Sequence, residues 1–282
     1  MSRTRPLSEP RERPRLVGVV NVTADSFSDG GRYLEPGAAT AHARRLLADG
    51  ADVVELGPAS THPDAARVPA DEEIRRIAPV LDALLPEGVP VSVDTRERET
   101  QRYCLRRGVP YLNDVAGFPD EALYEELAAA RAVLFVMHSV GGATREPLAP
   151  ERVLERVYAF FDARLRALTA AGVSRDRLVL DPGMGLFLGG RADASLAVLR
   201  DLPRLRRTFE LPVMVSVSRK SFLGELTGRP VHERGAATLA AELSAAALGA
   251  DYVRTHDVAA LRDALTVAAA LGTLPADGGL RK

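Results

Sequence analysis

The sequence predicts an α/β protein of the (β/α)8 TIM-barrel class, and three observations support this prediction. Short apolar, β-branched runs recur along the whole chain, and each is followed by a stretch with helical features. Apolarity that is continuous rather than alternating is typical of parallel strands buried on both faces. Eight such units fit within 282 residues without a break in composition, which is an ordinary length for one barrel domain.

The strands are predicted from their aliphatic and β-branched residues. In chain order they cover residues 16–20, 52–56, 89–93, 111–113, 133–137, 178–180, 212–217 and 252–254. An open, doubly wound sheet is the alternative arrangement for a chain with this alternation. No Gly-x-Gly-x-x-Gly segment follows the first strand, and this absence favours the closed barrel.

Helices are predicted between the strands from their start and stop signals. The predicted helices 38–49, 97–107, 151–171, 233–248 and 258–271 all precede a glycine. Glycine suits the position after a last helical turn because it readily adopts a left-handed backbone conformation. Pro119 and Pro150 are predicted to open two helices, since proline fits a first helical turn.

Composition and charge exclude several classes of protein. The 37 basic and 38 acidic residues give a net charge of −1, so no overall field favours nucleic acid or an anionic membrane. No apolar run is long enough to cross a bilayer, and the Arg-rich N-terminus lacks the apolar segment of a signal peptide. The single cysteine, Cys104, is predicted to be a small buried side chain in a protein of a reducing compartment.

A single barrel domain is predicted over residues 15–273. Residues 1–14, which are rich in arginine and proline, and residues 274–282 are expected to be flexible tails.

Polar residues follow every predicted strand, at the end where barrel enzymes carry their chemistry. These polar segments lie at residues 21–31, 58–64, 94–95, 113–114, 137–139, 181–183, 216–221 and 254–257. Some members, such as Ser60, Thr95 or Asp257, have the alternative role of capping a helix. Because all eight strands show this feature, we predict a binding site on one rim of the barrel.

The first group of rim residues, the pterin set, suits a flat heterocycle. It consists of Asp94, Asn113, Asp181 and Lys220. The 2-amino-4-oxo edge of a pterin offers N–H donors to carboxylates, and its O4 accepts from a lysine. Buried carboxylates without partners are costly, so a ligand or the lysine must satisfy them. A purely structural Asp–Lys pair is the alternative.

The second group, the diphosphate set, consists of Asn21, Thr61, Arg254 and His256. Arg254 and His256 are two residues apart, so both side chains can point the same way from the last strand. A guanidinium, an imidazole and a hydroxyl suit phosphate oxygens. The amide oxygen of Asn21 is suited to Mg²⁺, which prefers oxygen ligands. For His256 a structural role is the alternative, and for His138 a structural or supporting role is favoured.

Several of these segments, in this order, resemble the signatures of the dihydropteroate synthase family. They are residues 21–31, Ser92-Val93-Asp94-Thr95, Asn113-Asp114, Leu180-Asp181-Pro182-Gly183, Ser218-Arg219-Lys220-Ser221 and Arg254-Thr255-His256-Asp257. The resemblance covers about residues 16–271. It implies a cytoplasmic homodimer of folate biosynthesis with Mg²⁺ as cofactor. Such an enzyme condenses 6-hydroxymethyl-7,8-dihydropterin diphosphate with p-aminobenzoate.

The resemblance also implies roles for individual residues. The pterin is expected at Asp94, Asn113, Met137, Asp181 and Lys220, and the diphosphate at Asn21, Thr61, Arg254 and His256. The aminobenzoate set is Phe27, Phe187, Arg219 and Ser221. Asp94, Asp181, Lys220 and Asn21 are expected to take part in catalysis, with Asn21 as the metal ligand. A pterin-binding methyltransferase domain and a non-catalytic pterin-binding barrel are the alternatives.

Three segments depart from the family pattern. Ala24 stands where the first loop usually has proline, and residues 59–64 read Ala-Ser-Thr-His-Pro-Asp in place of Glu-Ser-Thr-Arg-Pro-Gly. The usual Gly-Phe-Gly-Lys after the sixth strand becomes Gly185-Leu186-Phe187-Leu188.

These departures resemble the sulfonamide-insensitive branch of the family, whose second loop reads Gly-Pro-Ala-x-x-His-Pro-Asp-Ala, as residues 57–65 do. A sulfonamide extends beyond the outline of p-aminobenzoate. Narrowing of the site by Phe187 would therefore reject the drug and keep the substrate. The alternative is that Leu186 and Phe187 are local packing changes.

Overall fold

The strands form one parallel sheet that closes on itself, as shown by a computed structural model that describes residues 13–22, 36–60, 65–139 and 148–274. The strands in this part of the chain are β1 (Arg15–Asn21), β2 (Val53–Gly57), β3 (Val91–Asp94), β4 (Tyr111–Asp114), β5 (Val133–Met137), β6 (Leu178–Asp181), β7 (Met214–Val215) and β8 (Tyr252–Thr255). They pair in the order β6-β5-β4-β3-β2-β1-β8-β7. A parallel bridge between Leu180 and Val213 joins the two ends of this sheet, so the predicted barrel is confirmed.

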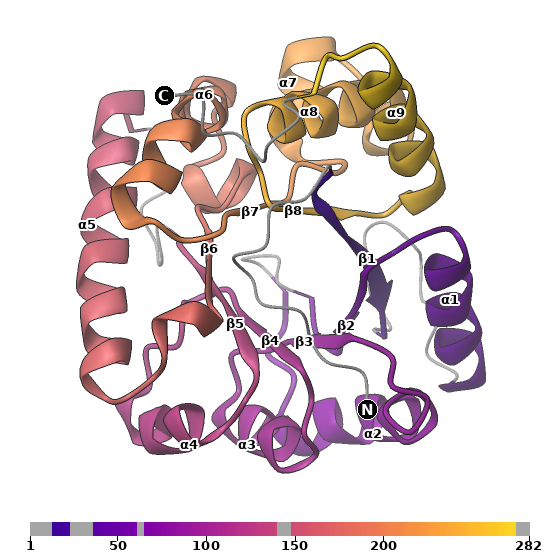
Figure 1. Ribbon diagram of the computed structural model, residues 1–282, viewed down its shortest axis with the longest axis vertical. Coiled ribbons are helices and arrows are strands. Elements are labelled where there is room, and N and C mark those ends of the chain that lie inside the picture. Colours follow the sequence, from indigo (N-terminus) through magenta and orange to yellow (C-terminus); the bar gives the residue numbers. More distant parts are fainter. Residues whose placement is uncertain (1–12, 23–35, 61–64, 140–147, 275–282) are drawn as a thin grey trace.

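Helices surround the barrel on the outside, as Figure 1 shows. They are α1 (Pro36–Ala48), α2 (Ala70–Leu84), α3 (Arg98–Arg106), α4 (Tyr124–Ala129), α5 (Pro150–Ala170), α6 (Ala192–Phe209), α7 (Ser221–Thr227), α8 (Gly235–Ala247) and α9 (Val258–Ala270). Four short 3₁₀ segments lie between them, η1 (Glu121–Leu123), η2 (Arg175–Arg177), η3 (Gly185–Leu188) and η4 (Val231–Glu233). Of the helices in this part of the chain, none combines the length and apolarity needed to cross a membrane.

The sequence signals located most elements to within a few residues. All eight predicted strands are present, although β7 is shorter than the predicted 212–217. The glycines after five predicted helices, at positions 50, 108, 172, 249 and 272, have φ between +67° and +104°. They therefore end these helices in the left-handed conformation that only glycine adopts without strain. Pro150 opens α5, as predicted.

One helix prediction was wrong, and the start of another was displaced by two residues. Pro119 does not open a helix, because Asp120 caps η1 and α4 begins only at Tyr124. The helix predicted over 233–248 begins at Gly235, after η4. No start or stop signal located α2 and α6. Each of these two helices contains a proline, Pro79 or Pro203, and proline is unusual inside a helix because it has no N–H to donate.

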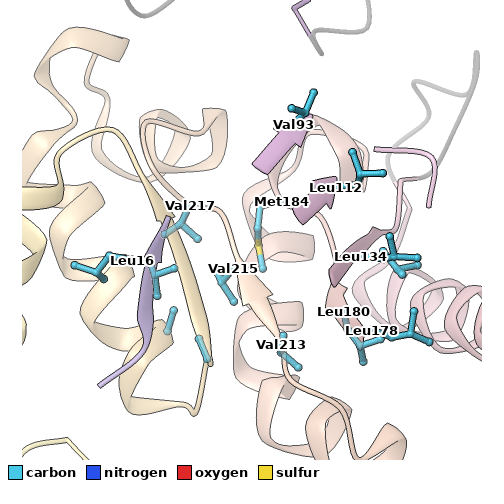
Figure 2. Packing of buried hydrophobic residues seen from close by; sticks show 14 of the residues in the cluster. Leu16, Val93, Leu112, Leu134, Leu178, Leu180, Met184, Val213, Val215 and Val217 are labelled. Carbon is cyan, nitrogen blue, oxygen red and sulfur yellow. The ribbon is translucent and has the colours of Figure 1, made fainter. Parts of the chain in front are cut away.

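Strand residues alternate between the barrel interior and the surrounding helices, because successive side chains of a strand point to opposite faces. Outward-facing apolar residues such as Leu16, Leu134 and Val215 belong to the large core shared with the helices, part of which Figure 2 shows. Inward-facing residues form a second, separate apolar cluster, which we call the barrel floor. It consists of Val17, Val53, Tyr111, Val133, Phe135, Val179, Met214 and Tyr252.

The next inward-facing residue, two positions further along the strand, is polar on several strands. On β2 it is Glu55, on β4 Asn113, on β6 Asp181 and on β8 Arg254, and all four are buried. The inward-facing residues of β3, Ser92 and Asp94, are polar as well. We call these six residues the polar layer. The barrel interior is therefore mainly apolar towards the amino ends of its strands, where the buried Arg15 donates to the hydroxyl of Tyr252, and polar at their carboxyl ends.

The ends of the described chain are packed. Arg13 forms an ion pair with Asp52 at 2.7 Å, and Leu274 contacts the large core. The predicted tails otherwise lie outside the described residues, so the domain boundaries stay predictions. Cys104 is buried among apolar side chains, as predicted, and burial raises the pKa of its thiol to about 12.

Candidate active site

The predicted pterin set comes together at the carboxyl ends of neighbouring strands. Asp94 on β3 is in register with Asn113 on β4, and Met137 on β5 is in register with Asp181 on β6. Lys220 lies in the segment between β7 and α7, directly before the first residue of α7. The carboxyl ends of parallel strands meet at one rim of a barrel. These five residues therefore share one site although they are far apart in the sequence.

The buried polar atoms of this set lack partners in the described part of the chain. They are Asp94 Oδ1, both side-chain atoms of Asn113, and Asp181 Oδ2. The other oxygen of Asp181 accepts from the backbone N–H of Gly183 at 2.9 Å. An unsatisfied buried polar group costs about 1–3 kcal/mol. Such a concentration of donors and acceptors is therefore expected of a site that binds a polar ligand.

A structural Asp–Lys pair does not explain these residues. Among the described interior carboxylates, the ion pairs are formed with Arg254 rather than with Lys220. The Nζ atom of Lys220 instead lies 4.9 Å from the centre of the Phe187 ring. The sequence had left this alternative open, and the geometry now disfavours it.

The interior carboxyls and the lysine affect one another's proton affinity. Burial, and then the negative charge of Glu55, raise the pKa of Asp94 to about 8. Burial also raises the pKa of Asp181, although the charge of Arg254 opposes this rise. Burial, and then repulsion by Arg254, lower the pKa of Lys220 to about 8. Asp94 and Lys220 thus both titrate close to neutrality, which suits groups that exchange hydrogen bonds or protons with a ligand.

Arg254, from the predicted diphosphate set, lies inside the polar layer. Its Nε is 2.7 Å from Glu55 Oε1, and its Nη2 donates to Glu55 Oε2 at 2.9 Å. Its Nη1 lies 4.0 Å from Asp181 Oδ2. The guanidinium therefore lies near one residue of the pterin set, Asp181, and is bound mainly by Glu55.

The rest of the diphosphate set lies at the same end of the barrel. His256 follows β8, and its Nδ1 is 2.9 Å from Ser218 Oγ, which also accepts from the His256 backbone N–H at 3.3 Å. Asn21 ends β1, and its Oδ1 is 3.4 Å from where a Cβ on Gly57 would lie. Gly57 therefore leaves room beside this amide. Thr61 lies outside the described residues.

Three members of the aminobenzoate set gather around Lys220. Phe187, in η3, packs its ring against the lysine amine, and Ser221 is the first residue of α7. Ser221 Oγ is buried and has no partner among the described groups. Arg219 has a φ of +59°, and its backbone N–H donates to Thr238 Oγ1 at 3.0 Å. The fourth member, Phe27, lies outside the described part of the chain.

Glu55 was missed by sequence reasoning. It lies within the apolar run of β2, is 2% exposed and accepts from Ser92 Oγ at 3.1 Å as well as from Arg254. The sequence did contain a signal for it. Glu55 is two residues after Val53, so both side chains point into the barrel, and a charged side chain buried there requires a buried partner.

Other polar residues of the rim have structural roles. Asp257 caps α9 by accepting from the Ala260 N–H at 3.1 Å. Thr95 accepts from the Glu97 N–H at 3.0 Å, and Asp114 accepts from the Ala116 N–H at 2.8 Å. His138 is buried with its Nδ1 3.2 Å from the Pro182 carbonyl oxygen, and burial lowers its pKa to about 4. A neutral, hydrogen-bonded ring agrees with the structural role favoured for this histidine.

Comparison with known proteins supports these observations. The model of a family described as pterin binding enzyme matches residues 17–256. A dihydropteroate synthase type-2 of Escherichia coli is 60% identical over 258 residues, which are 91% of this chain and 95% of that protein. A type-3 dihydropteroate synthase of Escherichia coli is 49% identical over 92% of this chain and 99% of its own length.

Among solved structures, a Xanthomonas albilineans dihydropteroate synthase with 4-aminobenzoic acid superimposes with a TM-score of 0.84 and 40% identity. The match covers 94% of this chain and 95% of that chain. The 60% and 49% identities to the type-2 and type-3 relatives exceed the 40% identity to the Xanthomonas albilineans enzyme. This difference agrees with the departures seen in the sequence.

Proposed function

The chain belongs to the family of pterin-binding enzymes, and from that premise we propose that it is a dihydropteroate synthase. It condenses 6-hydroxymethyl-7,8-dihydropterin diphosphate with p-aminobenzoate to give 7,8-dihydropteroate and diphosphate in folate biosynthesis. The observation that carries this proposal is the polar layer at the carboxyl rim. Its unpartnered carboxylate and amide atoms complement the donors and acceptors of a pterin edge.

The pterin binds between Asp94, Asn113 and Asp181, with Met137 against its face and Lys220 at its O4. Burial of the carboxyls supports this role, because the N–H groups of the ring would supply the hydrogen bonds that these oxygens lack. Binding of the pterin would thus offset part of the cost of burying these polar groups.

The diphosphate is bound by Asn21, Thr61, Arg254 and His256, and Mg²⁺ accompanies it. In the described residues, no group of three or more His, Cys, Asp and Glu side chains is arranged to hold a metal. Asn21 would hold Mg²⁺ through its amide oxygen, since this ion prefers oxygen ligands and phosphate partners. The bound ion would supply positive charge that stabilises the diphosphate as a leaving group.

In the reaction, the bond between the pterin methylene carbon and the diphosphate oxygen breaks, and both electrons leave with the diphosphate. Arg254 and His256 stabilise the charge on the leaving group. The positive charge on the methylene carbon is delocalised into the pterin ring and stabilised by Asp181 and Asp94. The amine of p-aminobenzoate then forms the new C–N bond and loses one proton. No covalent enzyme intermediate is required.

The p-aminobenzoate lies beside Lys220, among Phe27, Phe187, Arg219 and Ser221. The ring of Phe187 already occupies space next to the lysine amine. We further propose that this ring narrows the site so that a sulfonamide, which is longer than p-aminobenzoate, binds poorly. The exposure of the adjacent Leu186, at 44%, supports a role for Phe187 rather than Leu186 at the site.

The primary test is a coupled assay for diphosphate release. We expect release to require both the pterin diphosphate and p-aminobenzoate. A pterin-binding methyltransferase would release no diphosphate, and a non-catalytic pterin-binding protein would bind the pterin without turnover. Hydrolysed pterin formed in the absence of p-aminobenzoate would support bond breaking before amine attack.

The assembly and location follow from the same proposal. We propose a homodimer in the cytoplasm, a location with which the single buried Cys104 is consistent. Light scattering coupled to size-exclusion chromatography would give the mass in solution, and a mass near that of one 30.2 kDa chain would contradict the dimer.

A further inference from the structure

Glu55 and Arg254 form the central ion pair of the polar layer. Both carboxylate oxygens of Glu55 contact the guanidinium, through Nε at 2.7 Å and Nη2 at 2.9 Å. Ser92 Oγ donates to Glu55 Oε2 at 3.1 Å and so fixes the carboxylate from the other side. Glu55 is 2% exposed and Arg254 is 8% exposed. The pair is thus side-on and shielded from water. Its contact through Nη2 is a hydrogen bond, and its contact through Nε is a close ion pair without hydrogen-bond geometry.

Three carboxyls, Glu55, Asp94 and Asp181, share this interior with two basic groups, Arg254 and Lys220. Asp181 Oδ2 has no hydrogen bond in the described structure and lies only 4.0 Å from Arg254 Nη1. A small rotation of the guanidinium would therefore convert this long Asp181–Arg254 ion pair into a direct hydrogen bond.

Such a pair would occupy the oxygen that the pterin is expected to use. The buried guanidinium, freed of its partner, would gain the most by approaching the nearest carboxylate, because an uncompensated buried charge is costly. The side-on contact with Glu55 prevents this, since it engages two of the three guanidinium nitrogens and fixes the direction of the third.

From this geometry we propose that Glu55 is a positioning residue of the pterin site. It holds Arg254 side-on, keeps Asp181 free for the pterin, and leaves the Nη1 edge of Arg254 directed at the ligand. This inference rests on the proposed function of the rim and adds a residue that has no contact with the pterin in that proposal. Glu55 acts only through Arg254.

The test compares binding of the pterin alone in matched variants. The probe is 6-hydroxymethyl-7,8-dihydropterin, which lacks the diphosphate, titrated into the full-length protein by calorimetry. In Glu55→Gln we expect the Kd for this probe to rise about tenfold. The loss of an interaction between two residues in contact commonly changes an equilibrium constant by about this factor. The KM for the pterin diphosphate should rise as well, whereas the KM for p-aminobenzoate should stay within about twofold.

The decisive variant removes both charges. In Glu55→Leu with Arg254→Met, no guanidinium remains to approach Asp181, so the pterin affinity should return to within about threefold of wild type, although turnover stays low. Neutral, well-packed replacements of a buried ion pair are often tolerated by the fold. This double variant therefore decides the matter even where Glu55→Gln does not fold.

Two controls complete the design. Glu242→Gln alters a carboxyl on α8 that is also buried, at 1% exposed, and it should leave the pterin affinity unchanged. Glu55→Asp keeps the charge and should recover most of the affinity lost in Glu55→Gln. Wild-type affinity in a folded Glu55→Gln, or equal weakness in the single and double variants, would overturn the proposal. Because the titration needs no turnover, loss of the proposed enzymatic function would be seen separately in the wild-type assay.

Discussion

The barrel floor and the polar layer share strands β2, β4, β6 and β8, on which their side chains point to the same interior, yet their side chains find partners in different ways. In the floor, Phe135 stacks with Tyr111 at 5.6 Å and meets Tyr252 edge-on at 5.2 Å between ring centres. In the polar layer, one step of two residues further along, Asn113 has no side-chain partner in the described chain. The floor is complete without a ligand, whereas in the proposed function a ligand completes the polar layer. Stability and function are thus separated along the barrel axis.

The largest effect on stability is expected in the floor. Phe135→Ala removes a fully buried ring that packs against Tyr111 and Tyr252, and we expect the free energy of unfolding to fall by about 3–5 kcal/mol. Chemical denaturation would measure this loss. The pterin affinity of the remaining folded protein should change little. A loss of affinity as large as the loss of stability would contradict the separation of a stabilising floor from a ligand-binding polar layer.

The reverse result is expected in the polar layer. Asp181→Asn retains the acceptor for the Gly183 N–H but removes a buried charge, and so the melting temperature should stay the same or rise. The kcat/KM should fall about 100-fold or more, because a charged partner of the ligand is lost. Diphosphate release and thermal unfolding, measured on one preparation, would reveal both changes. A large drop in melting temperature would indicate that Asp181 is structural.

The pH dependence of stability offers a third comparison. The pKa of Asp94 is raised to about 8, well above its value of 3.8 in an unfolded chain, so the folded state without ligand binds the extra proton. The stabilising contribution of this proton is present below the unfolded pKa and is lost as the pH rises through 8. One such group contributes a slope of at most about 1.4 kcal/mol per pH unit.

The Asp94→Asn variant should therefore gain stability relative to wild type as the pH rises from 4 to 8. Urea unfolding at several pH values would test this difference. A difference that shrinks over this range would mean that Asp94 is ionised in the folded protein.

The smallest effect is expected at the edge of the polar layer. In Phe187→Gly the proposed narrowing is removed, and we expect sulfonamide inhibition to strengthen about tenfold, which is within the range for one apolar contact. The KM for p-aminobenzoate should change less than the inhibition constant. Leu186→Gly is the matched control and should leave inhibition as in wild type. Unchanged inhibition in Phe187→Gly would leave Phe187 with a packing role only.

The alternation of strands and helices made the fold predictable, because buried parallel strands have a recognisable composition and glycines end five of the helices. The rim was predictable for the same reason, since Asp94, Asn113 and Asp181 directly follow or end strands. Glu55 was not predictable as a site residue. It lies inside an apolar run, and its partner Arg254 is 199 positions away in the chain. Only closure of the barrel brings β8 beside β1 and so within reach of β2.

Helices with internal prolines were difficult for a related reason. In α2, the residues Ile77, Val80, Leu81 and Leu84 are buried against the barrel, and this tertiary packing outweighs the local cost of Pro79. The predicted roles of Thr61 and Phe27 stay predictions, because both residues lie outside the described part of the chain.

The contact between Phe187 and Lys220 has a consequence for the evolution of this enzyme. An aromatic face near an amine favours the charged form of the amine, and Lys220 already titrates near neutrality. In the proposed function, a substitution at position 187 would therefore change the surroundings of the lysine expected to bind the pterin as well as the aminobenzoate side of the site. Selection on drug binding at this position would then act on the use of the first substrate at the same time.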